Sequence, residues 1–135
     1  MAALGVEWLR RLCLSMPETT EQVQWENHLL FKVAGKMFTV ASLEPESHVL
    51  SLKVTPEEFA ELVERPGIVP APYLARAKWV ALERFDALRA SELERLVRGS
   101  YALVVSRLPK SKQPGSPPTV VKQKKGVGPK KRPTP

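Results

Sequence analysis

The sequence predicts an α+β fold, in which an antiparallel sheet of four to five strands is packed by helices on one face. The spacing of apolar residues carries this prediction. It is close to four near both ends of residues 1–108 and close to two between them, as expected for helices flanking a half-exposed sheet. With 135 residues, 43% of them hydrophobic, the chain has the length of one domain and enough apolar surface for a core.

The first helix is predicted between Leu4 and Met16. Leu4, Trp8, Leu12 and Met16 recur every four residues and form one apolar face. Cys13 lies beside that face, and we interpret it as a small buried residue, because free cysteine is usually buried and inert. As the single cysteine of the chain, it also excludes a framework of internal disulfides.

Strands are predicted next, because the apolar period shortens to two. They cover residues 20–25, 29–33, 37–43 and 49–54. Gly35-Lys36 is interpreted as a tight hairpin turn, with glycine supplying the positive φ that such a turn needs. Short connections between successive strands indicate an antiparallel meander.

A second helix is predicted to begin after Thr55. The Thr55 hydroxyl can accept from the amide of Glu58, and the Glu58 carboxylate can accept from the amide of Thr55, while Pro56 suits the first helical position. Residues 66–72 contain three prolines and are predicted to form a stiff loop. Residues 78–83 are predicted to form the last strand.

The last helix is predicted to begin at a second capping box, Ser91 with Glu94. Its apolar face carries Leu93, Leu96, Val97, Tyr101, Val104, Val105 and Leu108. A face of this length predicts that the last helix is the main cover of the sheet.

The charge of the chain is concentrated in a tail. Residues 1–108 carry 13 basic and 14 acidic side chains and sum to −1, whereas residues 109–135 carry 8 basic and no acidic side chains and sum to +8. The tail also holds 7 of the 13 prolines and no aromatic residue. We therefore predict a folded domain over residues 1–108 and a disordered, extended tail over residues 109–135.

The composition argues against several classes of chemistry. The two histidines, His28 and His48, are 20 residues apart, and Asp86 is the only aspartate, so neither a zinc site nor a Ser-His-Asp triad is predicted. The chain also lacks a glycine-rich phosphate loop. We expect no enzyme activity, no cofactor and no metal. A pocket enzyme using residues 73–79 remains a minor alternative.

A membrane protein is not expected either. No apolar run approaches the roughly 20 residues that span a bilayer, and no secretory signal opens the chain. The expected location is the cytoplasm.

Several sequence blocks resemble the MmcQ/YjbR family in order and spacing. These blocks are Trp25-Glu26-Asn27, residues 31–38, Leu50-Ser51-Leu52-Lys53, residues 66–74, Trp79-Val80 and residues 100–109. The resemblance covers roughly residues 4–109. It implies a small α+β fold of the kind shared with type III secretion chaperones. It also implies DNA binding through a double-wing arrangement of strands, and it transfers no catalytic residues.

The candidate DNA-binding residues fall into three groups. The wing candidates are Lys32, Lys36 and Lys53, which lie on strands or at the hairpin. The second group is Tyr73, Arg76 and Lys78, because aromatic stacking combined with cations holds exposed bases. The third group is the tail, whose cations predict sequence-independent, salt-dependent binding to phosphate; they are Lys110, Lys112, Lys122, Lys124, Lys125, Lys130, Lys131 and Arg132.

Each group has a competing interpretation. The strand lysines are also explained as solvated residues of a sheet face, and Tyr73 and Trp79 as core residues. The first hypothesis is therefore a non-enzymatic DNA-binding protein with a double-wing-like surface and a basic tail. The alternative is a protein-interaction or adaptor module with a secretion-chaperone-like fold, for which a near-neutral domain with an exposed sheet face is the sequence support. The oligomeric state stays open.

Overall fold

The computed structural model describes residues 4–24, 27–44 and 47–114. The helices are α1 (Val6–Leu14), α2 (Pro56–Leu62) and α3 (Ala90–Ser106), and the strands are β1 (Thr19–Gln24), β2 (His28–Val33), β3 (Lys36–Ser42), β4 (Leu50–Lys53), β5 (Ile68–Pro70) and β6 (Trp79–Leu82). Short 3-10 helices follow at η1 (Ala75–Ala77), η2 (Phe85–Ala87) and η3 (Lys110–Lys112). The predicted tail cations from residue 122 onward lie outside the described residues.

The six strands form one antiparallel sheet in the order β1-β2-β3-β4-β6-β5. This confirms the predicted α+β fold, with one strand more than expected. The additional strand is β5, so the prediction of a loop throughout residues 66–72 was wrong. Ile68 and Val69 pair with Leu82 and Ala81 of β6, and proline is tolerated in β5 because an edge strand leaves one side of its backbone unpaired.

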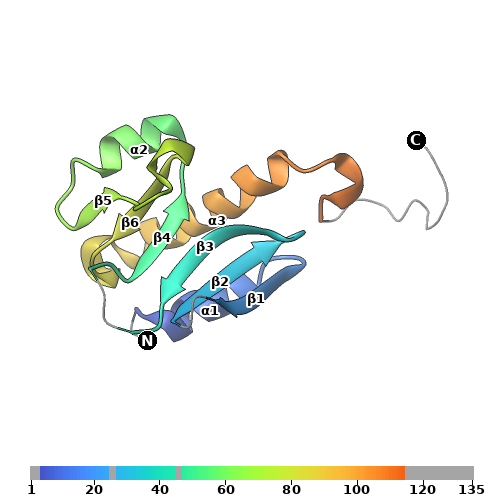
Figure 1. Cartoon of the computed structure of the whole chain (residues 1–135), viewed down its shortest axis with the longest axis horizontal. Coiled ribbons are helices and arrows are strands. Elements are labelled where there is room, and N and C mark those ends of the chain that lie inside the picture. Colours follow the sequence, from blue (N-terminus) through green and yellow to red (C-terminus); the bar gives the residue numbers. More distant parts are fainter. Residues whose placement is uncertain (1–3, 25–26, 45–46, 115–135) are drawn as a thin grey trace.

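Helices cover one face of the sheet. Figure 1 shows α1 and α3 on the same side, with α3 crossing behind β4 and β3. The main core lies in this layer, where Leu9 of α1, Leu62 of α2 and Leu93 of α3 join Phe31 and Leu50 of the sheet. The four-residue period at both ends of the domain therefore serves the helix layer, as predicted.

The opposite face of the sheet holds a smaller apolar cluster. Leu30, Val40, Trp79 and Ala81 are buried there together with Ala71, because alternate residues of a strand point to opposite faces. Leu74 packs against this cluster from the connection between β5 and β6. This connection thus covers part of the face that the helices leave open.

Of the two capping boxes predicted from the sequence, the one at α2 is present and the one at α3 is not. At α2, the amide of Glu58 donates to Thr55 Oγ1 (3.1 Å) and the amide of Thr55 donates to Glu58 Oε1 (3.0 Å), which confirms the capping box. At α3 the cap residue is Arg89, without a side-chain cap, so the predicted Ser91 capping box was wrong. The amide of Leu93 donates to the Arg89 carbonyl (2.9 Å), which already places Ser91 inside the first turn.

The β2–β3 hairpin turns at Ala34-Gly35, one residue earlier than predicted. Both residues have positive φ, 51° and 78°, as a two-residue type I′ turn requires. Lys36 is therefore the first residue of β3 and stays exposed at the tip of the hairpin.

A β-bulge in β3 and a serine of α3 lie where β3 and β4 separate. Phe31 pairs with Thr39 and Lys32 with Met37, so Phe38 is the extra residue of β3. The buried Ser100 hydroxyl of α3 donates to the Phe38 carbonyl and accepts from the amide of Lys53 (3.0 Å). Ser100 thus satisfies backbone groups of β3 and β4 where these strands separate.

Candidate nucleic-acid interface

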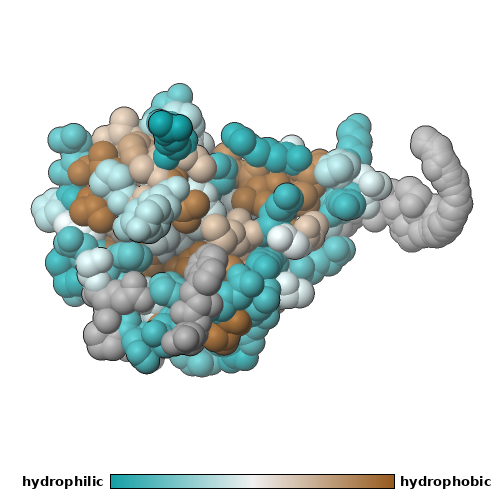
Figure 2. All heavy atoms as spheres, viewed as in Figure 1, coloured by the Kyte–Doolittle hydropathy of each residue, from teal (hydrophilic) through white to brown (hydrophobic). Residues whose placement is uncertain are grey.

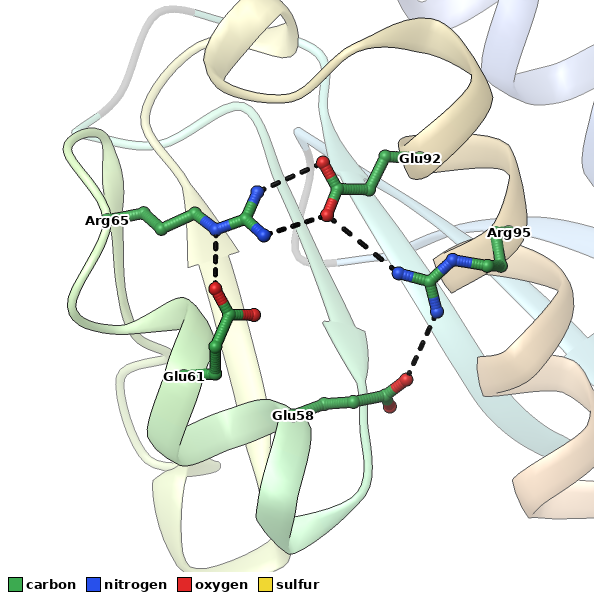
Figure 3. Close-up of polar contacts among 5 residues, drawn as sticks. All are labelled: Glu58, Glu61, Arg65, Glu92 and Arg95. Carbon is green, nitrogen blue, oxygen red and sulfur yellow. Dashed lines mark hydrogen bonds and ion pairs between the residues drawn. The ribbon is translucent and has the colours of Figure 1, made fainter.

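Five arginines of the described domain are paired with carboxylates. They are Arg10, Arg65, Arg84, Arg95 and Arg98. Pairing is densest where α2 meets the N-terminal turn of α3 (Figure 3). Arg65 Nε lies 2.7 Å from Glu61 Oε2 and Arg65 Nη2 lies 2.9 Å from Glu92 Oε2.

Arg95 extends this network from α3 to α2. Its guanidinium lies 3.5 Å from a carboxylate oxygen of Glu58 and 3.8 Å from one of Glu92. The hydrogen bond from Arg65, followed by its charge, lowers the pKa of Glu92 below its usual range, against the opposing effect of desolvation. We call these five residues, Glu58, Glu61, Arg65, Glu92 and Arg95, the paired cluster. Its three carboxylates and two guanidiniums pair with one another and sum to a charge of −1.

A different group of cations has no carboxylate partner among the residues described. Four of them are Arg76 and Lys78 in the connection from β5 to β6, Lys53, whose ammonium donates to Ala77 of that connection, and Arg107, whose charge acts on Lys53. Together with Tyr73 we call them the cationic loop. Lys112 and Lys36 also lack a carboxylate partner within the described ranges.

Lys53 joins β4 to this loop. Its ammonium donates to the carbonyl oxygen of Ala77 (2.7 Å), which fixes the side chain beside η1. Partial burial, followed by the positive charge of Arg107, lowers the pKa of Lys53. The C-terminal end of α3 therefore brings a second cation toward Lys53, although 54 positions separate the two residues in the sequence.

Lys78 and Tyr73 lie at the two ends of the loop, and both have left-handed backbone conformations, with φ of 65° and 66°. The Lys78 ammonium lies 5.1 Å from the centroid of the Phe59 ring, within the range of a cation–π contact. Tyr73 is fully exposed, whereas Trp79 is only 4% exposed. The core interpretation is thus confirmed for Trp79 and wrong for Tyr73.

The remaining sequence candidates are not gathered at this loop. Lys32 lies on β2, and its ammonium donates to Gln22 Oε1 of β1 (2.7 Å). Lys36 lies at the tip of the β2–β3 hairpin, and Lys110 and Lys112 lie in η3, directly after α3. Arg107 was missed as a candidate, because only the fold brings the end of α3 to β4.

The surface over the C-terminal half of α3 is partly apolar. Figure 2 shows hydrophobic side chains at the surface over the C-terminal half of α3, beside hydrophilic side chains of the β4–η1 region. Exposed ring and aliphatic surface next to unpaired cations suits a ligand with planar groups and negative charge.

Other chemistry has little support in the described ranges. No group of three or more histidine, cysteine or carboxylate side chains there is arranged to hold a metal ion. Burial raises the pKa of Cys13 to about 12, which keeps this thiol protonated and unreactive. Of the helices described, none has the length and apolarity to cross a membrane.

Solved structures similar to this chain include the following two. A DUF419-domain protein of Deinococcus radiodurans is 31% identical, with a TM-score of 0.72, over 80% of this chain and 84% of its own. A Pseudomonas syringae protein is 22% identical, with a TM-score of 0.63, over 74% of this chain and 98% of its own, and supports the fold alone. No curated protein matches the chain.

The family model YjbR matches residues 14–103. The match begins in α1 and ends in α3, so it includes all six strands and most of the cationic loop. The chain therefore belongs to the YjbR family.

Proposed function

We propose that this protein is a non-enzymatic DNA-binding protein whose folded domain contacts phosphates through the cationic loop. The observation that carries the proposal is that Lys53, Arg76 and Lys78 meet at one connection, with Arg107 near Lys53, and that none of the four has a carboxylate partner among the described residues. Lysine and arginine side chains that neutralise phosphates supply most sequence-independent affinity for DNA.

The tail adds a second source of affinity in this proposal. Residues 109–135 carry a charge of +8, and they begin directly after Leu108, close in sequence to Arg107. A chain of such cations binds phosphate without reading sequence, so the tail and the loop act on the same strand of nucleic acid. We place the protein in the cytoplasm as part of this proposal.

Salt dependence of binding tests the contribution of the domain. Full-length protein is titrated with a 20-base-pair duplex between about 50 and 200 mM salt. The triple variant Lys53→Gln, Arg76→Gln, Arg107→Gln is compared with a control of equal charge change, Arg11→Gln, Arg84→Gln, Arg98→Gln. Each lost phosphate contact lowers the slope of log K against log salt by about 1.

We expect the loop variant to have a lower slope than the control. Equal slopes for the two triple variants would remove the cationic loop from the proposal and leave only the tail. A full-length protein that binds neither the duplex nor a single strand at about 50 mM salt would refute the proposed function as a whole.

A protein-interaction module is the second candidate, and a separate observation favours it. β1 is an edge strand that pairs only with β2, and Val23 on it is 57% exposed. Val23 lines a shallow hollow with Val6, Leu29 and Leu43, which the Arg10–Glu21 ion pair borders. Exposed strand edges next to apolar surface are typical of sites where another chain adds a strand.

This candidate predicts a stoichiometric protein partner that survives nuclease treatment and is lost on Val23→Lys. Retention of the partner by the Val23→Lys variant, or recovery of nucleic acid alone, would count against it.

A further inference from the structure

Tyr73 combines backbone strain with complete exposure. Its φ is 66°, in a region that a residue with a Cβ rarely adopts. Its relative exposure is 104%, and the side chain makes no hydrogen bond, ion pair or ring contact within the described part of the chain. Neither burial nor pairing of the side chain offsets this strain, and residues held in such conformations are concentrated at functional sites.

The three other non-glycine residues with positive φ lie at turns or at a helix end, and Glu18 is in the turn between α1 and β1. Ala34 lies in the type I′ turn of the β2–β3 hairpin. Lys78 ends η1, and its carbonyl accepts from the amide of Val54 (2.9 Å). Tyr73 is the third residue of the turn Ala71–Leu74, which the amide of Leu74 closes on the Ala71 carbonyl (3.1 Å). A turn with proline second and a positive φ third takes glycine most easily at the third position, so the unusual feature is a tyrosine there whose ring is exposed to solvent.

Backbone hydrogen bonds hold the chain in place on both sides of Tyr73. The amide of Ala71 donates to the Trp79 carbonyl (3.1 Å), and the amide of Leu74 donates to the Ala71 carbonyl (3.1 Å). The amide of Trp79 in turn donates to the Leu74 carbonyl (3.2 Å). Ala71 is buried, and the residue before Tyr73 is Pro72, whose ring fixes its own φ. An exposed ring on a braced backbone loses little conformational entropy when a ligand stacks on it.

The charges around the ring identify the ligand. Arg76 lies three positions after Tyr73 and is exposed, Lys78 ends the same loop, and the Lys53 ammonium is fixed to Ala77. A flat π-face with nearby cations fits a planar group that carries negative charge at its side. A nucleobase with its phosphate has this chemistry, and base–aromatic stacking with cationic grooves is how single strands are bound.

We propose that Tyr73 is a base-stacking residue, so that the cationic loop binds single-stranded nucleic acid in preference to duplex. This inference rests on the proposed function and specifies its ligand class. In a duplex, both faces of an interior base are already stacked, so an exposed tyrosine ring gains nothing. In a single strand, the ring of Tyr73 is free to stack on a base while Arg76 and Lys53 approach the adjacent phosphates.

The test separates base contacts from phosphate contacts. Full-length protein is titrated with a 15-nucleotide thymidine strand, with an abasic strand of equal length and with a 15-base-pair duplex, all at one salt concentration. The variants are Tyr73→Phe, which keeps the ring, and Tyr73→Ala, which removes it. Val23→Ala is the control for loss of an exposed apolar side chain elsewhere.

We expect Tyr73→Ala to weaken binding of the thymidine strand about tenfold, in line with the loss of one stacked base. Binding of the abasic strand and of the duplex should change less than twofold, and Tyr73→Phe and Val23→Ala should resemble the parent protein. A uridine strand distinguishes DNA from RNA as the source of unpaired bases. Equal affinity for the thymidine and uridine strands would mean that RNA is also a ligand, whereas a preference for the thymidine strand would mean that the ligand is single-stranded DNA.

Two results would overturn this inference without touching the proposed function. One is a Tyr73→Ala variant that binds the thymidine strand as tightly as the parent. The other is an equal loss of affinity for thymidine, abasic and duplex ligands, which would mean that the substitution disturbs the phosphate contacts only. Absence of all nucleic-acid binding by the parent protein would instead refute the proposed function. Since Tyr73 is fully exposed, thermal unfolding of the variants should be unchanged and serves as the check on folding.

Discussion

The charged side chains at the two ends of α3 differ in whether they are paired with side chains of opposite charge. At its N-terminal turn, Glu92 and Arg95 join Glu58, Glu61 and Arg65 in the paired cluster (Figure 3). At its C-terminal end, Arg107 lies near Lys53, and neither side chain has a carboxylate partner among the residues described. The 17-residue helix α3 thus has a paired end, at the paired cluster, and a cationic end, at Arg107.

The difference separates charges that support the fold from charges that are open to a ligand. Ion pairs between α2 and α3 bring together two helices that share only part of the core, and a guanidinium shared by two carboxylates satisfies both partners. Lys53 instead is held next to another cation, which costs the domain stability. We infer that the paired end serves folding and the cationic end serves binding, and the predictions below test this division.

The largest effect is expected at Ser100, which lies between the two ends. In Ser100→Ala the Phe38 carbonyl and the Lys53 amide lose their buried partner. An unsatisfied buried polar group costs roughly 1–3 kcal/mol, so we expect a loss of about 3 kcal/mol in the free energy of unfolding, measured with urea. The control is Ser106→Ala, whose exposed hydroxyl donates to the carbonyl of Leu103 and should matter little. A loss below about 0.5 kcal/mol for Ser100→Ala would mean that water replaces the hydroxyl.

The second effect concerns the paired end alone. Arg65→Gln removes the guanidinium that joins Glu61 to Glu92, and we expect a loss in the free energy of unfolding that is smaller than that of Ser100→Ala, since exposed pairs are weak singly and stronger in networks. Nucleic-acid affinity should stay within twofold. The matched control is Arg84→Gln, whose pair with Asp86 is largely exposed and should contribute almost nothing. A large loss of nucleic-acid affinity in Arg65→Gln would contradict the division between the two ends.

The third prediction concerns the cationic end, where we expect weaker nucleic-acid binding without a loss of stability. Lys53→Gln removes a cation that burial and Arg107 disfavour, so the free energy of unfolding should stay equal or rise slightly. Loss of one phosphate contact should weaken nucleic-acid binding about fivefold near 100 mM salt and lower the salt slope by about 1. Arg98→Gln removes the same charge from an exposed pair with Glu94 and should leave the slope unchanged. Equal slopes for the two variants would show that net charge matters and position does not.

Local signals in the sequence predicted the elements, while long-range contacts determined the candidate site. The Thr55–Glu58 capping box needs only neighbouring residues and was predicted correctly. β5 was missed because its strand conformation depends on pairing with β6, which lies ten residues further along the chain. The alternation of residues 71–79 does not reveal that Trp79 is buried and Tyr73 exposed, because the left-handed backbone at Tyr73 determines this.

The proximity of Lys53 and Arg107 could likewise not be predicted from the sequence. Both residues are ordinary in the sequence, one at the end of a strand and one after the last helix. Only the packing of α3 across the sheet brings them together, and Ser100 fixes that packing at β4. A pattern read along the chain therefore predicts Lys53 as a candidate and gives no reason to add Arg107.

The smallest effect is the pH dependence of stability, which should differ between the two ends. The pKa of Glu92 is lower in the folded protein than in the unfolded chain, chiefly through its hydrogen bond with Arg65. The folded state therefore releases this proton more readily, so the stabilisation by Glu92 is present above the unfolded pKa of about 4.3 and is lost as the pH falls through the folded pKa.

The pKa of Lys53 is also lowered, so stability again rises with pH, but in the alkaline range. Its charged form is disfavoured in the folded state, so the penalty is present at neutral pH and disappears as the pH rises toward the unfolded value of about 10.4. In urea titrations from pH 3 to 10, Glu92→Gln should flatten the acid limb and Lys53→Gln the alkaline limb, each by less than about 1 kcal/mol because both groups are partly solvated. If Lys53→Gln flattened the acid limb instead, Lys53 would be coupled to a carboxylate, and the cationic end would be a second paired cluster.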